Sequence, residues 1–450
     1  MNNSYLIKDI TIVNEYSQFE GSVFIENGRI NKILPQGSAL TYYEYRANII
    51  DGKGKVLLPG IIDDQVHFRE PGLTHKADID TESKAAVIGG VTSYMEMPNT
   101  KPQTITNELL EQKYKLADGR SYANYSFYLG ATNDNIEEVK NLAIDKNCGI
   151  KVFMGASTGN MLVDQDEALK KIFNYAPTIV AVHCEDEETI QNNLQKAKNE
   201  YGDEIPIKMH PEIRSSEACY LSSSKAKKLA ERYNAHLHIL HLSTEKELEL
   251  LEKGEFPEKK SITAEACVHH LWFNELDYKE KETLIKWNPA IKKESDRVAL
   301  LQAVLDDRID VIATDHAPHT LEEKQNSYLK APSGGPLIQH SLLMMLELYH
   351  RGLLSLEKIV QKMAHNPARL FRIWHRGYIK EGYWADLVIV DHNKETKVSK
   401  ESLFYKAGWS PVENYSFKSN ITHTFVNGIL VAHNGEIVSQ PAGMRLSFDR

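Results

Sequence analysis

The chain alternates between two hydrophobic patterns. Short apolar runs rich in β-branched residues are separated by longer segments in which apolar residues recur every three or four positions. Strands that alternate with amphipathic helices have this pattern, and it is typical of successive βα units around a parallel sheet. We predict eight strands, at residues 56–62, 91–97, 124–129, 149–154, 178–183, 236–242, 261–268 and 310–315.

The segments between the strands carry helix signals. Residues 216–233, 245–253 and 296–307 have helical periodicity, with Ser, Thr or Asp near their starts and Gly near their ends, as helix caps require. Eight parallel strands joined by helices predict an α/β fold, a closed (β/α)8 TIM barrel. We expect the barrel to span residues 56–375.

The two flanks of the barrel have a different pattern. Residues 1–55 and 376–450 contain short alternating strands separated by turns such as Asn27-Gly28 and Asn427-Gly428. Neither flank is long enough to form a separate sheet with its own hydrophobic core. The sequence therefore predicts one small β-sandwich-like domain built from both chain ends, with the barrel inserted between them.

Composition narrows the functional classes. The 450 residues are 42% hydrophobic and 26% charged, as in an ordinary globular chain. The sequence has no apolar stretch of 18 residues, so it predicts no membrane-spanning helix. The start of the chain lacks the pattern of a signal peptide, and the four cysteines are widely spaced with no CxxC. We therefore expect the protein to be located in the reducing cytoplasm. The net charge of -9 argues against nucleic acid or an anionic membrane as a partner. An anionic substrate would need local cations.

Polar residues follow the predicted strands at equivalent ends. In a TIM barrel the active site gathers at the carboxyl ends of the strands, because the loops there converge on the barrel axis. The residues at these positions are His67, Arg69, Asn99, Lys151, His183, His241, His269, His270 and Asp315.

Strand periodicity predicts which of these side chains face inward. Leu237, Ile239 and His241 share one face of their strand, and His236 and His238 share the other. We predict that His241 faces the barrel interior and that His236 and His238 contact helices or solvent. His67, His183, His241 and Asp315 would then surround the barrel mouth.

Three imidazoles and a carboxylate favour Zn²⁺, a borderline ion that binds His nitrogen and Asp oxygen. Bound water would fall from a pKa of 15.7 to about 7, which supplies hydroxide at neutral pH. Any one of these histidines alone would be interpreted as an ordinary core or surface residue. Their joint placement predicts a hydrolytic metal site.

Lys151 lies in a predicted strand beside these ligands, where an ammonium group would be repelled by dications. If CO2 carboxylates its amine, the carbamate offers two oxygens that can bridge two metal ions. The alternative is a lysine whose stem packs in the strand and whose head reaches solvent.

Several segments, in order and spacing, resemble the dihydroorotase branch of the amidohydrolase superfamily. The resemblance covers essentially the whole chain, and the combination of REPG, MPNT and TDHAPH is specific to dihydroorotases. The matching segments are IDDQVHFREPG (62–72), MPNTKP (97–102), GIKVFMGAST (149–158), HCEDEE (183–188), ILHLSTEKE (239–247), KWNPAIK (286–292), ATDHAPH (313–319) and the closing GYIKEGYWADLVIVD.

The resemblance implies a zinc hydrolase that interconverts dihydroorotate and N-carbamoyl-aspartate in pyrimidine synthesis. His67 and Asp315 would bind one zinc, His183 and His241 the other, and carboxylated Lys151 would bridge them. Asp315 would be the catalytic residue that carries the proton to the departing ring nitrogen. The substrate carboxylate would contact Arg69, Asn99 and His319, and the ring would contact Asn288.

One position departs from the family pattern. Family members usually carry His-x-His after the first barrel strand, whereas this chain has Gln65 at the first of the two positions. Because an amide oxygen is a weaker zinc ligand than imidazole, we predict a weaker metal site at His67 and Asp315 and a retained site at Lys151, His183 and His241. The chain could hold one or two zinc ions.

Two other functions stay open at this point. The chain could be another cyclic amidase of the dihydropyrimidinase, hydantoinase or allantoinase type, or an inactive scaffold for aspartate transcarbamoylase. The small anionic substrate is the expected partner, and a homodimer and an association with aspartate transcarbamoylase are both open. Weaker candidates are a pocket-wall role for His269 and His270, a lid at 155–160, backbone contacts at 333–336 and a solvated helix start at 185–188.

Overall fold

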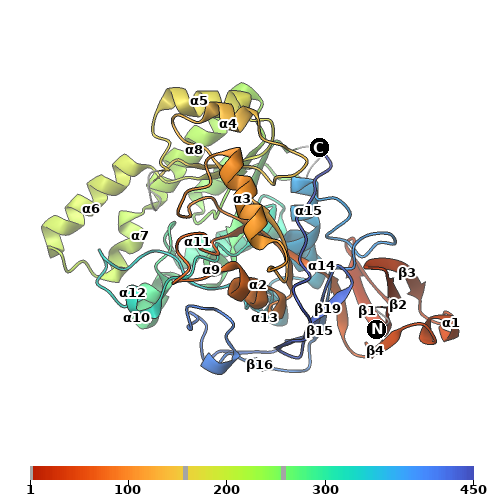
Figure 1. Cartoon of the computed structure of the whole chain (residues 1–450). Coiled ribbons are helices and arrows are strands. Elements are labelled where there is room, and N and C mark those ends of the chain that lie inside the picture. Colours follow the sequence, from red (N-terminus) through yellow and green to blue (C-terminus); the bar gives the residue numbers. More distant parts are fainter. Residues whose placement is uncertain (1–3, 156–160, 255–259) are drawn as a thin grey trace.

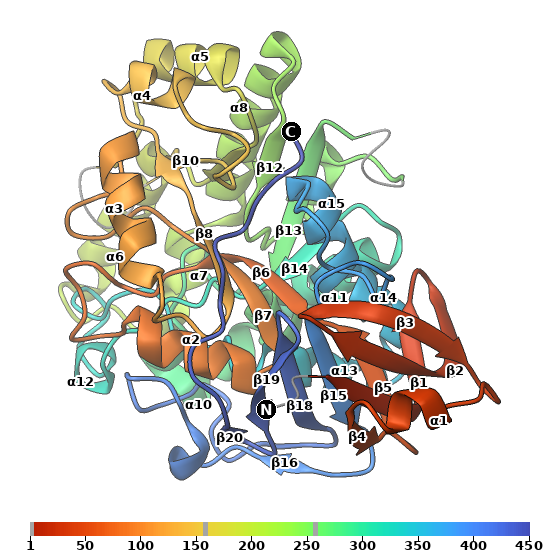
Figure 2. The same ribbon diagram turned by 45° about the vertical axis from the view of Figure 1, so that its right-hand side comes forward.

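The computed structural model describes residues 4–155, 161–254 and 260–450. A barrel of parallel strands surrounded by helices forms one part of the molecule, and a sheet built from both chain ends lies beside it (Figures 1 and 2). The predicted fold class is confirmed. None of the helices in these ranges combines the length and the apolar character needed to cross a lipid bilayer.

Eight strand positions form the barrel in the described ranges. Parallel pairing joins the strands into a three-stranded and a six-stranded run, and a parallel bridge between Val66 and His316 links the first strand to the segment after the last. The strands are β6 (Ile61–Val66), β7 (Val91–Glu96), β8 (Asn124–Phe127) with its continuation β9 (Leu129–Gly130), β10 (Ile150–Phe153), β11 (Val180–His183), β12 (Leu237–Ile239), β13 (Ile262–Cys267) and β14 (Val311–Ala313).

Helices cover the outside of this barrel (Figure 1). The longest, α8 (Ser216–Tyr233), begins where the Ser215 side chain accepts from the Ala218 N–H and ends at Asn234 in a left-handed conformation. The helix predicted at 245–253 is wrong, because the chain there forms only the 3-10 segment Lys246–Leu250. The other helices are α2 (Ile79–Ile88), α3 (Asn107–Ala117), α4 (Ile136–Lys140), α5 (Asp166–Tyr175), α6 (Glu187–Tyr201), α7 (His210–Ile213), α9 (Val268–Trp272), α10 (Tyr278–Lys281), α11 (Glu294–Leu305), α12 (Leu321–Lys324), α13 (Ser341–His350), α14 (Leu356–Val360) and α15 (Asn366–Phe371).

Both chain ends contribute to one nine-stranded sheet, and α1 (Thr41–Glu44) contacts it through the rings of Tyr43 and Phe24. Its hydrogen-bonded order is β20-β19-β18-β15-β5-β1-β2-β3, and β4 pairs with β1. Its strands are β1 (Tyr5–Asn14), β2 (Ser17–Glu26), β3 (Arg29–Pro35), β4 (Asn48–Asp51), β5 (Val56–Pro59), β15 (Leu387–Asp391), β18 (Asn420–Val426), β19 (Ile429–His433) and β20 (Glu436–Ile437); β16 (Thr396–Lys397) and β17 (Ser416–Phe417) form a separate pair.

The strand predicted at 56–62 is two strands. β5 pairs with β1 and β15 in the terminal sheet, whereas β6 starts the barrel. Gly60 lies between them, and a Cβ at this position would lie 2.1 Å from Thr92 Oγ1. The chain therefore changes sheets at a residue where only glycine fits.

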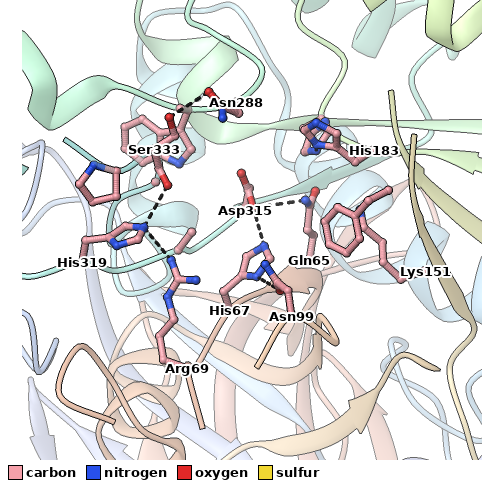
Figure 3. Close-up of a pocket in the computed structure, with 16 residues that line it drawn as sticks. Gln65, His67, Arg69, Asn99, Lys151, His183, Asn288, Asp315, His319 and Ser333 are labelled. Carbon is pink, nitrogen blue, oxygen red and sulfur yellow. Dashed lines mark hydrogen bonds and ion pairs between the residues drawn. The ribbon is translucent and has the colours of Figure 1, made fainter. Parts of the chain in front are cut away.

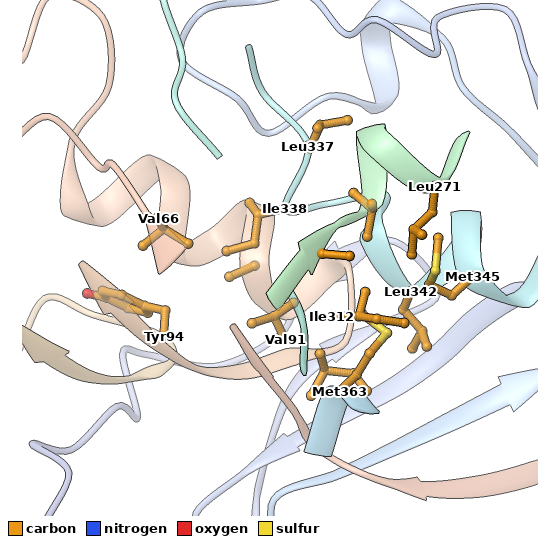
Figure 4. Close-up of a cluster of buried hydrophobic side chains, with 14 of the residues drawn as sticks. Val66, Val91, Tyr94, Leu271, Ile312, Leu337, Ile338, Leu342, Met345 and Met363 are labelled. Carbon is orange, nitrogen blue, oxygen red and sulfur yellow. The ribbon is translucent and has the colours of Figure 1, made fainter. Parts of the chain in front are cut away.

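The apolar core has an outer and an inner part. Between the strands and the helices, side chains such as Val91, Ile312 and Leu342 pack together (Figure 4). Inside the barrel a second cluster includes Tyr128, Phe371 and residues of the C-terminal tail, among them Leu446 and Phe448. This packing fills much of the barrel interior, and many of the polar side chains gather at its mouth.

The buried histidine His340 predicts a pH dependence of stability. Burial lowers the pKa of His340 to about 3, well below its ordinary value of 6.5, and its Nδ1 accepts from the Tyr405 hydroxyl at 3.1 Å. Below pH 6.5 the unfolded chain therefore binds a proton at this histidine that the folded chain excludes. The contribution of His340 to the free energy of unfolding is therefore highest above pH 6.5 and falls as the pH decreases toward 3. We expect this residue to lower the free energy of unfolding by about 1.4 kcal/mol per pH unit in that range.

Urea unfolding of the wild type and His340→Gln at pH 8 and pH 5.5 measures this contribution. The variant should lose less stability between the two pH values than the wild type, by about 1.4 kcal/mol. His75→Gln, at an exposed histidine, is the matched control. Equal pH dependence in His340→Gln and the wild type would contradict the prediction.

Candidate active site

The residues to which the sequence assigns a metal-binding, catalytic or substrate-binding role lie around one cavity of about 140 Å³ at the barrel mouth (Figure 3). They come from the ends of different strands and the loops that follow them. The cavity is lined by Gln65, His67, Arg69, Asn99, Lys151, Phe153, His183, His241, Trp287, Asn288, Asp315, Ala317, His319, Pro332, Ser333 and Gly334. Their proximity is a structural fact, whereas their roles remain predictions.

Three of these residues have a left-handed backbone. Arg69 has φ 68°, His241 has φ 41° and Asp315 has φ 46°, a region that residues other than glycine rarely adopt. Such a conformation costs about 1 to 3 kcal/mol and persists where the surrounding structure enforces it. It also interrupts the alternation of side chains along the strand, so these three side chains do not point in the direction that a two-residue period predicts.

The period-2 prediction for β12 is therefore wrong. Leu237 and Ile239 pack in the outer core, whereas Leu240 belongs to the cluster inside the barrel. His238 is fully buried against Asp64 rather than in contact with helices or solvent, and only His236 is exposed as predicted. His241 reaches the cavity because its left-handed φ turns the side chain inward.

His67 and Asp315 form the first pair of candidate ligands. The His67 Nδ1–H donates to Asn99 Oδ1 at 2.8 Å, which leaves the Nε2 lone pair facing Asp315 Oδ1 at 3.1 Å. Burial lowers the pKa of His67, which favours the neutral ring. A lone pair that faces a carboxylate is repulsive unless a cation lies between them.

His183 and His241 form the second pair. His183 Nδ1 lies 2.9 Å from His241 Nε2, and the other ring nitrogen of His183 lies 3.1 Å from Glu185 Oε2. Burial lowers the pKa of both rings, so two neutral imidazoles face each other. Glu185 lies at ion-pair distance from the outer nitrogen of His183, where carboxylates commonly orient metal-binding histidines, and His183 Nδ1 faces the site.

Glu185 itself contradicts the prediction of a solvated helix start. The carboxylate is fully buried and pairs with Arg214. Burial alone would raise the pKa of Glu185, but Arg214 and His183 lower it to about 2. Sequence reasoning missed its orienting role, for which the only signal was its position two residues after His183.

Lys151 is buried in β10 and points toward the cavity (Figure 3). Within the described ranges no carboxylate lies within ion-pair distance of its amine, which packs 4.6 Å from the centre of the Phe153 ring. Burial lowers the pKa of Lys151 to about 7, so the neutral amine that reacts with CO2 is well populated. The head does not reach solvent.

The donor atoms around the cavity are suited to a metal ion. The two pairs present unprotonated nitrogens and a carboxylate toward the same cavity, and His183 and His67 each have an oxygen partner on their outer nitrogen. Three imidazoles and one carboxylate suit Zn²⁺. The donor set therefore fits the predicted ion.

The side-chain oxygen of Gln65 does not point toward His67 and Asp315. Its Nε2 donates to Asp315 Oδ1 at 3.2 Å, and its Oε1 lies 3.8 Å from Cys267 Sγ. In this orientation Gln65 supports Asp315 through a hydrogen bond and offers no ligand atom to a cation.

Arg69 creates a site for an anion. The side chain is only 4% exposed, and burial lowers its pKa to about 10, so it stays charged at neutral pH. Its Nε donates to Pro318 O at 2.9 Å. Among the described residues, no carboxylate lies within ion-pair distance of this guanidinium.

His319 does not supply the missing acceptor. Lys76 donates to His319 Nδ1 at 2.9 Å, so the proton of this ring lies on Nε2, where it donates to Ser333 O at 3.0 Å. Arg69 Nη2 therefore faces an N–H group at 3.0 Å. A buried charge with no counter-ion is costly, and a ligand carboxylate would relieve that cost.

The loop at 333–336 closes the far side of the cavity. Ser333 Oγ donates to Asn288 Oδ1 at 2.9 Å, and Ser333 and Gly334 both line the cavity. His269 and His270 do not line it; His269 stacks on Trp287 and His270 faces Pro289 O at 3.2 Å. The lid considered at 155–160 falls, apart from residue 155, outside the described residues.

Comparisons with known proteins agree with this geometry. Residues 56–431 match the model of the amidohydrolase family. An L-hydantoinase from Arthrobacter aurescens has the same fold, with a TM-score of 0.92, 26% identity and coverage of 98% of this chain and 99% of that one. A dihydropyrimidinase from Brevibacillus agri NCHU1002, at 24% identity and a TM-score of 0.88, supports the fold alone.

The chain belongs to the amidohydrolase family. Several of its sequence relatives within this family are dihydroorotases. The dihydroorotase of Pyrococcus abyssi is 34% identical over 95% of both chains, and that of Pyrococcus furiosus is 35% identical over 95% of this chain and 92% of its own. The resemblance seen in the sequence is confirmed, and the chain is a hydrolase of the cyclic-amide type.

Proposed function

We propose that the chain interconverts dihydroorotate and N-carbamoyl-aspartate, a step of pyrimidine synthesis, with Zn²⁺ as cofactor. The observation that carries the proposal is the buried Arg69, which has no counter-ion among the described residues and lies in the same cavity as the two ligand pairs. A cyclic amide that bears a carboxylate supplies the missing counter-ion. A neutral ring such as dihydrouracil or hydantoin would leave the guanidinium unpaired.

The zinc ligands follow from the two pairs. His67 and Asp315 would hold one ion, His183 and His241 the other, and Lys151 as its carbamate would bridge them. When bound, Zn²⁺ would lower the pKa of a coordinated water from 15.7 to about 7 and so supply a nucleophile at neutral pH.

The chain's own residues would orient the substrate and move the proton. Arg69, with Asn99 and His319 beside it, would fix the carboxylate, and Asn288 would contact the ring. Asp315 would accept the proton of the attacking water and deliver it to the departing ring nitrogen, and the direction of transfer reverses in ring closure.

A comparison of substrates tests this function. We expect the zinc-loaded protein to turn over dihydroorotate with a kcat/KM at least about 1,000-fold above that for dihydrouracil, because a site built for a polar group rejects analogues that lack it. Hydantoin and allantoin are the further comparisons. A preference for any neutral ring would favour another cyclic amidase.

Loss of turnover would have a different meaning. A protein that binds no zinc and converts dihydroorotate in neither direction would favour the scaffold function, and binding to aspartate transcarbamoylase then becomes the property to measure. That association, a homodimer and a cytoplasmic location remain predictions from the sequence.

Gln65→His is expected to strengthen the metal site at His67 and Asp315. The variant adds an imidazole where the wild type has an amide that donates to Asp315, so zinc affinity of this site should rise by about 10- to 100-fold. Competition with a chelator, followed by metal analysis, measures the change. Gln65→Leu is the control, because it removes the hydrogen bond and adds no ligand. Two tight sites of equal affinity in the wild type would contradict this interpretation of Gln65.

A further inference from the structure

A second group of potential ligands lies inside the barrel, apart from the cavity. Asp64 on β6, His238 on β12 and Glu265 on β13 are each fully buried. One ligand atom from each side chain lies within 4.8 Å of the other two. None of the three lines the cavity at the barrel mouth.

The facing atoms of this group have no hydrogen-bond partner. His238 Nε2 lies 3.2 Å from Asp64 Oδ2 and 3.8 Å from Glu265 Oε2, yet these atoms and Asp64 Oδ1 make no hydrogen bond. Native proteins rarely leave buried polar atoms without a partner, and a bound ion satisfies such atoms where no donor or acceptor of the chain does.

The hydrogen bond at Nδ1 of His238 orients the ring so that Nε2 faces Asp64 and Glu265. Thr263 Oγ1 donates to Leu237 O at 3.2 Å, so the same hydroxyl accepts from His238 Nδ1 at 2.9 Å. Nδ1 therefore carries a proton, and when the ring is neutral its Nε2 is an unprotonated donor atom that faces two carboxylates. A cation between the three groups turns that repulsion into attraction.

Glu265 is oriented in a similar way. Its Oε1 accepts from the His241 backbone N–H at 3.0 Å and from Cys267 Sγ at 3.1 Å. The other oxygen, Oε2, is left to face Asp64 and His238. Such contacts to the outer oxygen are typical of ligands held for a metal.

We propose that Asp64, His238 and Glu265 bind a divalent transition-metal ion, with Zn²⁺ the best match. Two carboxylates neutralise its charge in the barrel interior, and one imidazole completes a donor set that Zn²⁺ accepts. Ligand bonds of about 2.1 Å allow ligand atoms up to about 4.2 Å apart, which includes both distances from His238 Nε2. The ion would join three strands and, through Glu265, hold the backbone of His241.

An anomalous difference map at the zinc absorption edge tests the site directly. Crystals of the full chain, purified and soaked with Zn²⁺, should have a peak within about 2.3 Å of His238 Nε2 and of an oxygen of both Asp64 and Glu265. Zinc at His183 and His241 with no peak at His238 would overturn the proposal. In that case the carboxylates hold His238 as an imidazolium, since their contacts outweigh burial and raise its pKa to about 9.

Metal analysis in solution gives an independent readout. His238→Gln and Asp64→Asn should each bind one zinc ion fewer per chain than the wild type, while His236→Gln, an exposed neighbour, should bind the same number. Unchanged zinc content in folded His238→Gln would overturn the proposal. If neither variant folds, the map of the wild type decides. The result does not depend on turnover of dihydroorotate, so the two proposals fail separately.

Discussion

Asp315→Asn should lower kcat for dihydroorotate by about 10,000-fold and leave KM within a few-fold of the wild type. General acid–base transfer contributes up to about 10,000-fold, and an amide at this position cannot accept and return the proton. The substitution is nearly isosteric, and its Oδ1 can still accept from Gln65 Nε2, as Asp315 Oδ1 does at 3.2 Å. Steady-state kinetics in both directions measure the loss.

Zinc content decides how that loss is interpreted. Zinc bound at His183 and His241 should persist in Asp315→Asn, because Asp315 belongs to the other pair. Asp449→Asn, at an exposed carboxylate, is the control and should keep full activity. A kcat within tenfold of the wild type, with zinc in place, would mean that Asp315 does not carry the proton.

Arg69→Gln should lower kcat/KM for dihydroorotate by about 1,000-fold, mostly through KM. Loss of one partner of a buried charge pair costs about 2 to 5 kcal/mol, and here the substrate carboxylate would lose its counter-ion. Turnover of dihydrouracil, which has no carboxylate, should change little. Kinetics on the two substrates separate binding of the anion from general damage to the site.

Arg69→Lys is the matched variant for this prediction. It keeps the charge but loses the planar fork that fits a carboxylate, so it should recover only part of the lost kcat/KM. Equal losses on both substrates in Arg69→Gln would contradict a role in carboxylate binding. They would indicate that Arg69 acts through the loop it joins at Pro318.

Strand periodicity located the barrel but not every side chain. The apolar runs predicted all eight strand positions, because strands buried on both faces have continuous apolar segments. The same periodicity failed at β12, where it placed His238 outward. The left-handed φ of His241 lies beyond what a pattern of residue types encodes.

Residue identities determined much of the candidate site. Eight strands that alternate with helices predict a (β/α)8 barrel, in which residues at the carboxyl ends of the strands meet at one mouth. His67, His183, His241 and Asp315 could therefore be selected as a metal-ligand set from the chain alone. The departure at Gln65 was also visible in the chain.

Only the tertiary structure decided how these groups are oriented and paired. The amide of Gln65 donates to Asp315, Arg69 has no counter-ion in the described part of the chain, and Glu185 orients His183. The group of Asp64, His238 and Glu265 also emerges only when three strands close around it. The pattern of residue types in the sequence determines which residues alternate along one strand. The hydrogen-bond partner of each side chain, and the direction of each bond, depend on residues distant in sequence that only closure of the barrel brings together.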